Sequence, residues 1–442
     1  MSTKSACADG SVRPRSQQLY RRGRLVFPDG VTRATIEKDP HPIYVSSGSG
    51  AYVVDVDGNR FLDLNNNFTT LLHGHAFEPV AEAVARLLRS GTCFANPTQH
   101  EIALAELLVS RIPAIERVRF VNSGTEAVMF AIKAARTYTG RPAIARFAGA
   151  YHGGYDWGEG DMPTPLQPPR GKLFASAAST GSAIELQFND SDGVEEALSA
   201  NADRLAAVII DPMPSRAGLL KPTEEFIRRL MAAARRHGVL IIADEVLNLR
   251  QSFQGASARY GLFPDLLTAG KIIGGGFPIG AIGGRAEVMS VFGGATRTPV
   301  ISQGGTFSAN PVSMKAGLIA MEAADEACFA DLETKGDQLR RKLAQTAQRW
   351  ELPFSITGAA SLFRIHAKRQ APTSYAEARP TAEEHDRLLA LTRFFRDRGI
   401  LLPFGAAACL STAMTDADVD RIAATFEAFV VEATHVSKEA QQ

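Results

Sequence analysis

The sequence predicts an α/β protein whose sheet is mainly parallel and covered by helices on both faces. Apolar runs alternate with amphipathic stretches through the middle of the chain. Two of the runs, residues 205–210 and 239–243, are apolar along their whole length, which is typical of strands buried on both faces. The chain has 442 residues, 45% of them hydrophobic. It is long enough for roughly two or three domains around a large core.

The beginning of the chain predicts a small β-rich region. Residues 1 to 16 are predicted to be disordered, and a basic stretch over 20–27 is predicted to be helical. A strand at 43–45 and a hairpin over 51–63 follow. Asp57-Gly58-Asn59 is predicted to turn this hairpin, because apolar residues alternate on both sides of it.

The other elements follow from hydrophobic periodicity and capping residues. Residues 155–188 contain four prolines and little periodicity, so we expect a long active-site loop there. Predicted helices cover residues 78–89, 100–112, about 127–137, 224–236, 313–324, 331–350, 381–398 and 415–432, and further predicted strands cover 118–121, 143–147 and 361–365.

Composition narrows the possible partners. The formal net charge is +1 and there is no basic stripe, so no nucleic acid partner is expected. No apolar run is long enough for a membrane span, and the first twelve residues lack the apolar segment of a secretory signal. The four cysteines are scattered without a Cys-x-x-Cys pair, which argues against a disulfide framework or a metal site and fits a cytoplasmic protein.

Lys271 ends an apolar run and precedes Gly274-Gly275-Gly276. Apolar neighbours remove water from the amine, which lowers its pKa and lets it attack a carbonyl to form a Schiff base. The glycines leave room for a bulky group beside the lysine. We therefore expect Lys271 to hold an aldehyde cofactor. Taken alone, the pattern also fits a lysine at a strand end beside a flexible loop.

Two polar turns are candidates for binding an anion. Asn122-Ser123-Gly124-Thr125 lies between a predicted strand and a predicted helix, where free N–H groups and the helix dipole favour a phosphate. Gly124 lets the backbone approach, and Ser123 and Thr125 add hydroxyl donors. Residues 303–311 are small and polar and fit a second phosphate contact. Alone, the first turn also fits an ordinary N-cap, and the second a plain loop.

An aromatic ring and a carboxylate follow two predicted strands. Tyr151 comes after the strand at 143–147, where it can stack on a flat ring; a core or rim aromatic is the alternative. Asp244 directly follows the strand at 239–243, and a buried carboxylate needs a partner. A protonated pyridine nitrogen would be one, with Val246 packed on the same ring. A helix cap or an arginine partner would also explain Asp244.

These five stretches together supply what pyridoxal 5′-phosphate needs: a lysine, a carboxylate at the ring nitrogen, a stacking ring and two anion turns. The chain resembles the class III (subgroup II) aminotransferases of the fold type I pyridoxal-phosphate enzymes. It is most similar to their branch of glutamate-1-semialdehyde aminomutases and β-amino acid aminotransferases. The resemblance covers about residues 20–430, and its motifs are at 120–127, 151–154, 244–246, 270–276 and 305–307.

The resemblance implies a large cofactor-binding domain at 76–312 with a mainly parallel seven-stranded sheet. A small α+β domain would come from both chain ends, 17–75 and 313–442, after the disordered residues 1–16. Catalytic roles are implied for Lys271, which would form the Schiff base and move the substrate proton, for Asp244 at the pyridinium nitrogen, and for Tyr151 on the ring. The implied cofactor contacts are Ser123, Gly124, Thr125, Glu126, Tyr151, His152, Asp244, Val246, Lys271 and Thr306.

Thr306 would reach the phosphate of a neighbouring subunit's cofactor, so the resemblance also implies a homodimer with active sites at its interface. Other positions depart from the family pattern. The segment 401–411 has no charged residue, whereas aminomutases carry a glutamate there, and β-phenylalanine-type aminotransferases carry an arginine where Gly405 stands. Asp211-Pro212 replaces the usual Glu-Pro.

Residues 28–33 align with the family's N-terminal carboxylate-binding segment. Arg33 is therefore the candidate for the substrate carboxylate, since its guanidinium matches a carboxylate bidentately; a surface arginine is the alternative. The sequence predicts an aminotransferase that moves an amino group from a carboxylate-bearing amine, such as a β-amino acid, to a 2-oxo acid by ping-pong kinetics. Alternatives are an aminomutase of the glutamate-1-semialdehyde type, an ω-amine transaminase and a non-catalytic cofactor-binding regulator.

Overall fold

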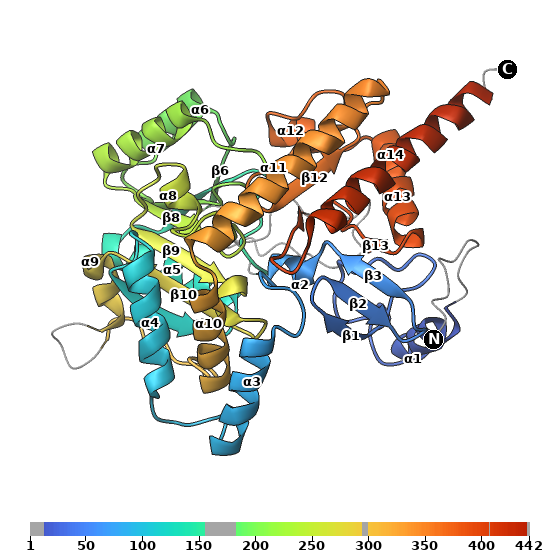
Figure 1. Ribbon diagram of the computed structural model, residues 1–442. Coiled ribbons are helices and arrows are strands. Elements are labelled where there is room, and N and C mark those ends of the chain that lie inside the picture. The colour runs from blue at the N-terminus through green and yellow to red at the C-terminus, as the bar shows by residue number, and fades with distance from the viewer. Residues whose placement is uncertain (1–12, 155–182, 294–298, 406, 440–442) are drawn as a thin grey trace.

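A large central sheet and two smaller sheets organise the chain (Figure 1). The structure, a computed structural model, describes residues 13–154, 183–293, 299–405 and 407–439. The central sheet has seven strands in the order β4 (Arg117–Val121), β10 (Gly280–Gly284), β9 (Leu266–Gly270), β8 (Leu240–Asp244), β7 (Leu205–Ile210), β5 (Ala143–Phe147) and β6 (Ala183–Leu186).

Most pairs in this sheet are parallel, which confirms the predicted fold class. β10 is the exception, because it runs antiparallel to both β4 and β9. It was not predicted, since its sequence is mostly glycine. The glycines are required by close neighbours: a Cβ on Gly280 would lie 2.1 Å from the Ser123 carbonyl oxygen, and one on Gly284 would lie 2.3 Å from that of Asp265.

Helices cover both faces of the sheet. Ile209 and Ile242 belong to an apolar cluster with helix α5 (Gly124–Thr139). Val208 and Ile241, their neighbours along the strands, belong to another with α7 (Glu224–His237) and α6 (Ser191–Ala200). Alternate side chains therefore enter opposite cores, which explains why β7 and β8 are apolar along their whole length.

The two chain ends meet in a smaller sheet. β1 (Val45–Ser49), β2 (Tyr52–Asp55) and β3 (Arg60–Asp63) form the predicted meander, with Gly58 in its turn. β13 (Ile400–Leu401) pairs with β3 in parallel and so adds a strand from the other end of the chain. A third sheet contains β11 (Ser355–Thr357), β12 (Leu362–His366) and β14 (Ala408–Cys409).

The remaining helices surround these sheets. The longer ones are α1 (Pro14–Gly23), α3 (Glu78–Leu87), α4 (Gln99–Arg111), α10 (Pro311–Ala323), α11 (Glu326–Arg349), α13 (Ala382–Asp397) and α14 (Asp416–Glu439). The short ones are α2 (Asn66–Thr69), α8 (Ala256–Arg259), α9 (Ala286–Met289), α12 (Tyr375–Ala378), η1 (Leu88–Ser90), η2 (Asn248–Gln251), η3 (Lys271–Gly274) and η4 (Ser290–Phe292). None of the helices in the described residues is long and apolar enough to cross a membrane.

Two local predictions need correction. The sequence predicts disorder over residues 1–16 and a helix over 20–27. Within the described residues, the helix is α1, which begins earlier, at Pro14, and ends earlier, at Gly23. It begins early because Asp57 accepts hydrogen bonds from the backbone N–H groups of Arg15 and Ser16, at 2.8 and 3.0 Å. The predicted loop 155–188 is shorter at its end because β6 starts at Ala183; its residues 155–182 lie outside the described chain.

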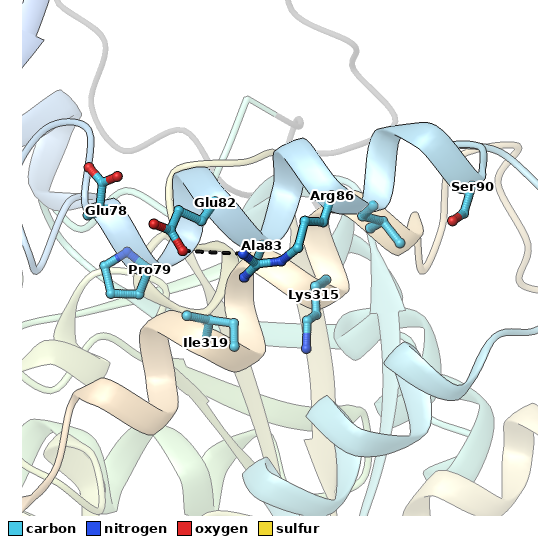
Figure 2. A pocket seen from close by; sticks show the side chains of 9 residues that line it. Glu78, Pro79, Glu82, Ala83, Arg86, Ser90, Lys315 and Ile319 are labelled. Atoms are coloured by element: carbon cyan, nitrogen blue, oxygen red, sulfur yellow. Dashed lines mark hydrogen bonds and ion pairs between the residues drawn. The ribbon is translucent and has the colours of Figure 1, made fainter.

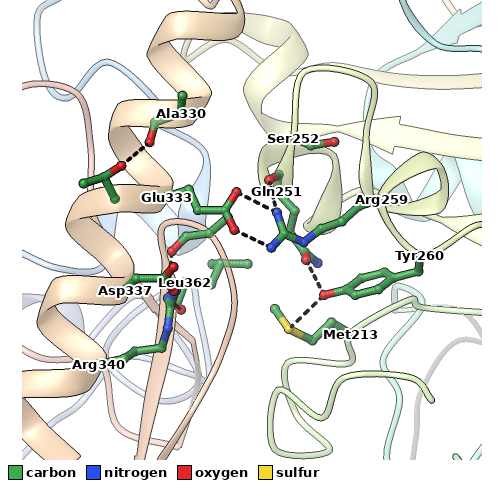
Figure 3. A network of polar contacts seen from close by, with 12 residues as sticks. Met213, Gln251, Ser252, Arg259, Tyr260, Ala330, Glu333, Asp337, Arg340 and Leu362 are labelled. Carbon is green, nitrogen blue, oxygen red and sulfur yellow. Dashed lines mark hydrogen bonds and ion pairs between the residues drawn. The ribbon is translucent and has the colours of Figure 1, made fainter. Parts of the chain in front are cut away.

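Polar contacts fasten α11 to the loops beside the central sheet (Figure 3). Glu333 on α11 pairs with Arg259 at the end of α8, with Oε2 2.9 Å from Nη1. The Tyr260 hydroxyl donates to Gln251 Oε1 at 2.7 Å. Arg340, further along α11, donates from Nη1 to the carbonyl oxygens of Ala360 and Leu362, each at 2.7 Å.

Arg250 connects distant segments from inside the protein. Its fully buried guanidinium donates to the carbonyl oxygens of Thr69 and Leu410, at 2.7 and 2.6 Å, and to the Ser361 hydroxyl at 3.1 Å. No carboxylate bonds it within the described residues. One arginine therefore joins the loop after β8 to segments from both ends of the chain.

We expect Arg250→Met to lower the free energy of unfolding by ~3 kcal/mol, because it leaves several buried acceptors without a donor. The exposed Arg228→Met on α7 is the matched control, with an expected change within ~0.5 kcal/mol. Denaturant unfolding followed by circular dichroism measures both. Equal effects of the two substitutions would contradict the role of Arg250.

Candidate active site

Most of the predicted site residues follow strands whose carboxyl ends share one edge of the central sheet. β5, β7, β8 and β9 are parallel, and β4 runs the same way because both β4 and β9 are antiparallel to β10. Asp244 ends β8, and Lys271 directly follows β9. Ligand sites of such sheets lie beyond the carboxyl ends of the strands. The topology therefore gathers the motifs that the sequence separates.

Lys271 lies at a constrained point of the chain. Its φ of 49° is in the left-handed region, which is uncommon for a lysine and is often found at functional sites. Burial lowers the pKa of its amine, while the nearby carboxyl groups of Asp244 and Asp211 oppose the shift. A Cβ on Gly275 would lie 2.4 Å from the Ala316 carbonyl oxygen, so glycine is required where the chain turns after Lys271.

Asp244 is buried, and both of its oxygens have partners. Oδ2 lies 2.7 Å from His152 Nδ1, and Oδ1 accepts from the Thr268 hydroxyl at 3.0 Å and from the Val246 N–H at 3.1 Å. Burial alone would raise the pKa of Asp244, but the hydrogen bond and charge of His152 lower it below its usual value. The group is thus a carboxylate at neutral pH. Its partner is His152, and no arginine bonds it within the described residues.

Asp211, which follows β7, is a second buried acid nearby. Its Oδ1 accepts from the Met213 N–H at 3.0 Å and from the Asn248 side-chain amide. Burial first, and the charge of Asp244 second, raise the pKa of Asp211 well above its usual value. Asp211 therefore binds a proton more readily than Asp244, whose pKa is lowered.

Sequence reasoning missed Asp211 and Thr268 as parts of this site. Thr268 had a visible signal, since it is the polar residue inside the apolar run 266–270. Asp211 was noticed only as a departure from a motif. Asn248 had no signal, because its link to Asp211 joins loops after different strands. The chain of hydrogen bonds continues from Asn248 to Gln251, whose side-chain nitrogen donates to Asn248 Oδ1 at 2.5 Å.

The turn after β4 has the geometry of an anion site. Ser123 caps α5, with its hydroxyl accepting from the Glu126 N–H at 3.2 Å, as an ordinary N-cap does. The Glu126 carboxylate turns back and accepts from the Asn122 N–H at 2.9 Å. Within the described residues, the N–H groups of Gly124 and Thr125 have no acceptor. These two donors at a helix N-terminus remain available to an anion.

Glycines bring the turn and the other motifs into contact. A Cβ on Gly124 would lie 2.7 Å from Val246 Cγ1, and a Cβ on Gly270, beside Lys271, would lie 3.3 Å from the same atom and 3.8 Å from the Gly124 nitrogen. Val246 therefore lies between the anion turn and the end of β9. On the other side, the Gly154 N–H donates to Thr125 Oγ1 at 3.2 Å, which joins the segment of Tyr151 to the turn.

Tyr151 and His152 point to different environments. Tyr151 is 40% exposed, and the guanidinium carbon of Arg216 lies 3.9 Å from the centre of its ring. His152 is buried on Asp244, and its Nε2 has no partner in the described part of the chain. An exposed ring next to a buried carboxylate is compatible with the predicted stacking role of Tyr151.

Arg33 and Thr306 are at exposed positions. Arg33 Nη1 donates to Asn67 Oδ1 at 3.0 Å, in a stretch from Asn66 to Thr69 whose φ angles are all left-handed, 47° to 70°. Neither residue has a hydrogen bond to Lys271 or Asp244 in the described chain. The loop of Thr306 lies beside the anion turn, since a Cβ on Gly305 would be 3.2 Å from Asn122 Nδ2.

A cavity of about 660 Å³ lies elsewhere, between α3 and α10 (Figure 2). Its wall includes Glu78, Glu82, Arg86 and Lys315, with Arg86 paired to Glu82 at 3.2 Å. It contains none of the predicted site residues. Its open walls and mixed charges lack the chemistry found at Lys271, so we place the active site at the sheet edge.

The residues at the sheet edge fit pyridoxal 5′-phosphate. A buried amine of lowered pKa, an ionised carboxylate and free N–H donors at a helix start suit its aldehyde, its ring nitrogen and its phosphate. The close approach of Val246 to Gly124 places an apolar side chain beside the anion turn, as a flat ring requires. These fits rest on the chain's own atoms.

Comparison with known proteins gives the same answer. The class III aminotransferase family profile (Aminotransferase class-III) matches residues 34–430. The chain is 39% identical to the glutamate-1-semialdehyde 2,1-aminomutase of Thermomicrobium roseum over 420 residues, 92% of this chain and 95% of that protein.

Solved structures agree. An ω-transaminase from Sphaerobacter thermophilus has a TM-score of 0.91 and 43% identity, covering 96% of this chain and 99% of that one. A β-phenylalanine aminotransferase from Variovorax paradoxus has a TM-score of 0.86 and 30% identity, covering 96% and 95%. A transaminase with PLP bound has a TM-score of 0.86 and 36% identity, covering 96% and 98%. This chain therefore belongs to the class III aminotransferase family of pyridoxal-phosphate enzymes.

Proposed function

We propose that this protein moves an amino group from a carboxylate-bearing amine, in particular a β-amino acid, to a 2-oxo acid. The observation that carries the proposal is that Asp244, buried and ionised, and Lys271, a buried amine of lowered pKa, lie at the carboxyl ends of the neighbouring strands β8 and β9. The similarity to an ω-transaminase and a β-phenylalanine aminotransferase supports transamination. The uncharged segment after β13 supports a donor with an apolar body.

Each part of the site has a proposed task. Bound pyridoxal phosphate supplies an aldehyde carbon and an electron-withdrawing ring. Lys271 Nζ holds the cofactor and, when an amino donor displaces it, removes the proton from the carbon that bears the amino group. Asp244, oriented by His152 and Thr268, holds a negative charge at the ring nitrogen.

The other proposed contacts position the cofactor and substrate. Tyr151 and Val246 would cover the two ring faces, and the turn from Ser123 to Thr125 would bind the phosphate. Glu126 would act on that turn through Asn122. We propose Arg33 for the donor carboxylate, because its exposed guanidinium bonds only an uncharged amide in the described residues.

We propose a homodimer in which Thr306 reaches the partner's cofactor phosphate. Exposed apolar side chains gather near that loop: Phe307 is 58% exposed and Phe94 is 52% exposed. The Asn310 amide donates to the Thr92 carbonyl at 2.9 Å, which holds the two segments together. We place this dimer in the cytoplasm, where its described cysteines would remain free thiols.

An aminomutase is the second candidate, because a relative of that name is 39% identical over 92% of this chain. An isomerase returns the amino group to the same molecule and needs no acceptor. The absence of a charged residue in 401–411 disfavours it.

A half-reaction screen tests the proposed function. We expect 3-amino-3-phenylpropanoate or a similar β-amino acid to bleach the absorbance of the lysine-bound cofactor, and a 2-oxo acid to restore it. Full turnover should require a stoichiometric amount of the 2-oxo acid. Turnover without an acceptor would instead establish the isomerase. If no amine bleaches the absorbance, transamination is excluded.

The two buried acids should respond differently to loss of charge. Asp244→Asn removes the carboxylate and should lower kcat by ~10²–10⁴-fold. The raised pKa of Asp211 means that it holds a negative charge less firmly than Asp244, so Asp211→Asn should cost ~10-fold or less. Steady-state kinetics of the two near-isosteric variants, with folding checked by circular dichroism, compares them. Equal losses would show that the negative charge is not specific to Asp244.

The rate at which the cofactor-free enzyme takes up pyridoxal phosphate should rise with pH as the Lys271 amine loses its proton. Burial lowers the pKa of this amine, so the midpoint should lie below that of an exposed lysine. Asp244 raises the pKa, and Asp244→Asn should therefore move the midpoint to lower pH. Stopped-flow absorbance gives the profile, and a shift to higher pH would refute the coupling.

A further inference from the structure

A second arginine, Arg216, lies at the same edge of the sheet. It stands on the loop that begins with Asp211 after β7, and its guanidinium carbon lies 3.9 Å from the centre of the Tyr151 ring. Its side chain is exposed, and no acid pairs with it in the described part of the chain. It is therefore an uncompensated cation next to a residue of the proposed cofactor site.

The backbone at Arg216 is held from beneath. Arg364 is buried on β12, and its Nη1 donates to the carbonyl oxygens of Ser215 at 2.8 Å and Arg216 at 3.2 Å. The Thr357 hydroxyl donates to the Gly218 carbonyl at 2.7 Å. The loop that carries Arg216 is thus fixed, and a group on it has a defined position.

The same loop adjoins the segment that lacks charge. The Ala407 N–H donates to the Ser215 hydroxyl at 3.2 Å, which places Arg216 beside the stretch that includes Gly405. That stretch provides no cation of its own. A positive charge is nevertheless present in this part of the site, because the loop after β7 supplies it.

The contact with Tyr151 leaves the guanidinium able to bind. A guanidinium that stacks on an aromatic ring by its face still presents its N–H groups along its edge. Those groups match a carboxylate bidentately. The acids nearby do not compete, since Asp244 is bonded to His152 and Thr268, and Asp211 accepts from the Met213 N–H and the Asn248 side-chain amide.

We propose that Arg216 is a specificity-determining residue that binds the carboxylate of the 2-oxo acid acceptor. This rests on the proposed transaminase function. In a 2-oxo acid the carboxylate is attached directly to the reacting carbon, whereas in a β-amino acid it is one carbon further away. Arg216 contacts Tyr151, the proposed ring-stacking residue, whereas Arg33 bonds Asn67. Arg216, the cation beside the Tyr151 ring, is therefore suited to the carboxylate of the 2-oxo acid, which lies nearer to the reacting carbon.

Arg216→Gln should raise the Michaelis constant for the acceptor 2-oxobutanoate by ~10- to 100-fold, relative to that for propanal, which lacks the carboxylate. Arg216→Lys keeps the charge but loses the fork, and should lie between Arg216→Gln and the wild type. Calorimetry with the non-reactive analogue oxamate, on the pyridoxamine-phosphate form, should show a similar loss of affinity. The exposed Arg228→Gln on α7 is the control and should change neither quantity.

Two outcomes would overturn the assignment. One is an unchanged ratio of the two Michaelis constants together with unchanged oxamate affinity in Arg216→Gln. The other is that Arg33→Gln, and not Arg216→Gln, weakens oxamate. Failure of the proposed function is distinguishable, because it would appear in the wild type as no transfer to any 2-oxo acid.

Discussion

The rest of the site depends on keeping one carboxylate, Asp244, ionised where water is excluded. A buried charge is costly unless it has partners. Asp244 has three partners: the His152 ring, the Thr268 hydroxyl and the Val246 N–H. The two neighbouring acids, Asp211 and Glu245, are bonded to other groups. Burial and the charge of Asp244 raise the pKa of Asp211. Glu245 turns away and accepts from the N–H groups of Ala256 and Ser257 at the start of α8, both at 2.7 Å. Of these three acids, Asp244 is the one whose pKa is lowered.

This charge acts at a place where segments from the whole chain meet. Arg250 joins the loop after β8 to Thr69 and Leu410, so the strand that ends with Asp244 is mechanically tied to both chain ends. The Arg250 guanidinium, which donates to the Thr69 carbonyl, helps to hold the left-handed backbone at Asn66–Thr69. We therefore propose that substrate selection resides on loops around the sheet edge and cofactor chemistry on the strand ends.

Local sequence was sufficient for the parts of the fold that local chemistry controls. Apolar runs marked β7 and β8, and the motifs around Lys271 and Asp244 marked the strand ends. β10 was not predicted, because its glycines show no hydrophobic periodicity. They are required by close contacts with distant segments, such as Ser123. The raised pKa of Asp211 and the stacking of Arg216 on Tyr151 also depend on tertiary contacts between loops, which no single stretch of sequence encodes. The expected role of Arg33 came from alignment with a family segment, whereas the contact of its guanidinium with the uncharged Asn67 amide depends on the folded chain.

The central claim is that Asp244 holds a positive charge on the ring nitrogen of the cofactor. Nitrogen-15 NMR of the enzyme loaded with ring-labelled pyridoxal phosphate measures this most directly. We predict the chemical shift of a protonated ring nitrogen throughout the neutral pH range in the wild type, and that of an unprotonated nitrogen in Asp244→Asn. An unprotonated nitrogen in the wild type would contradict the account.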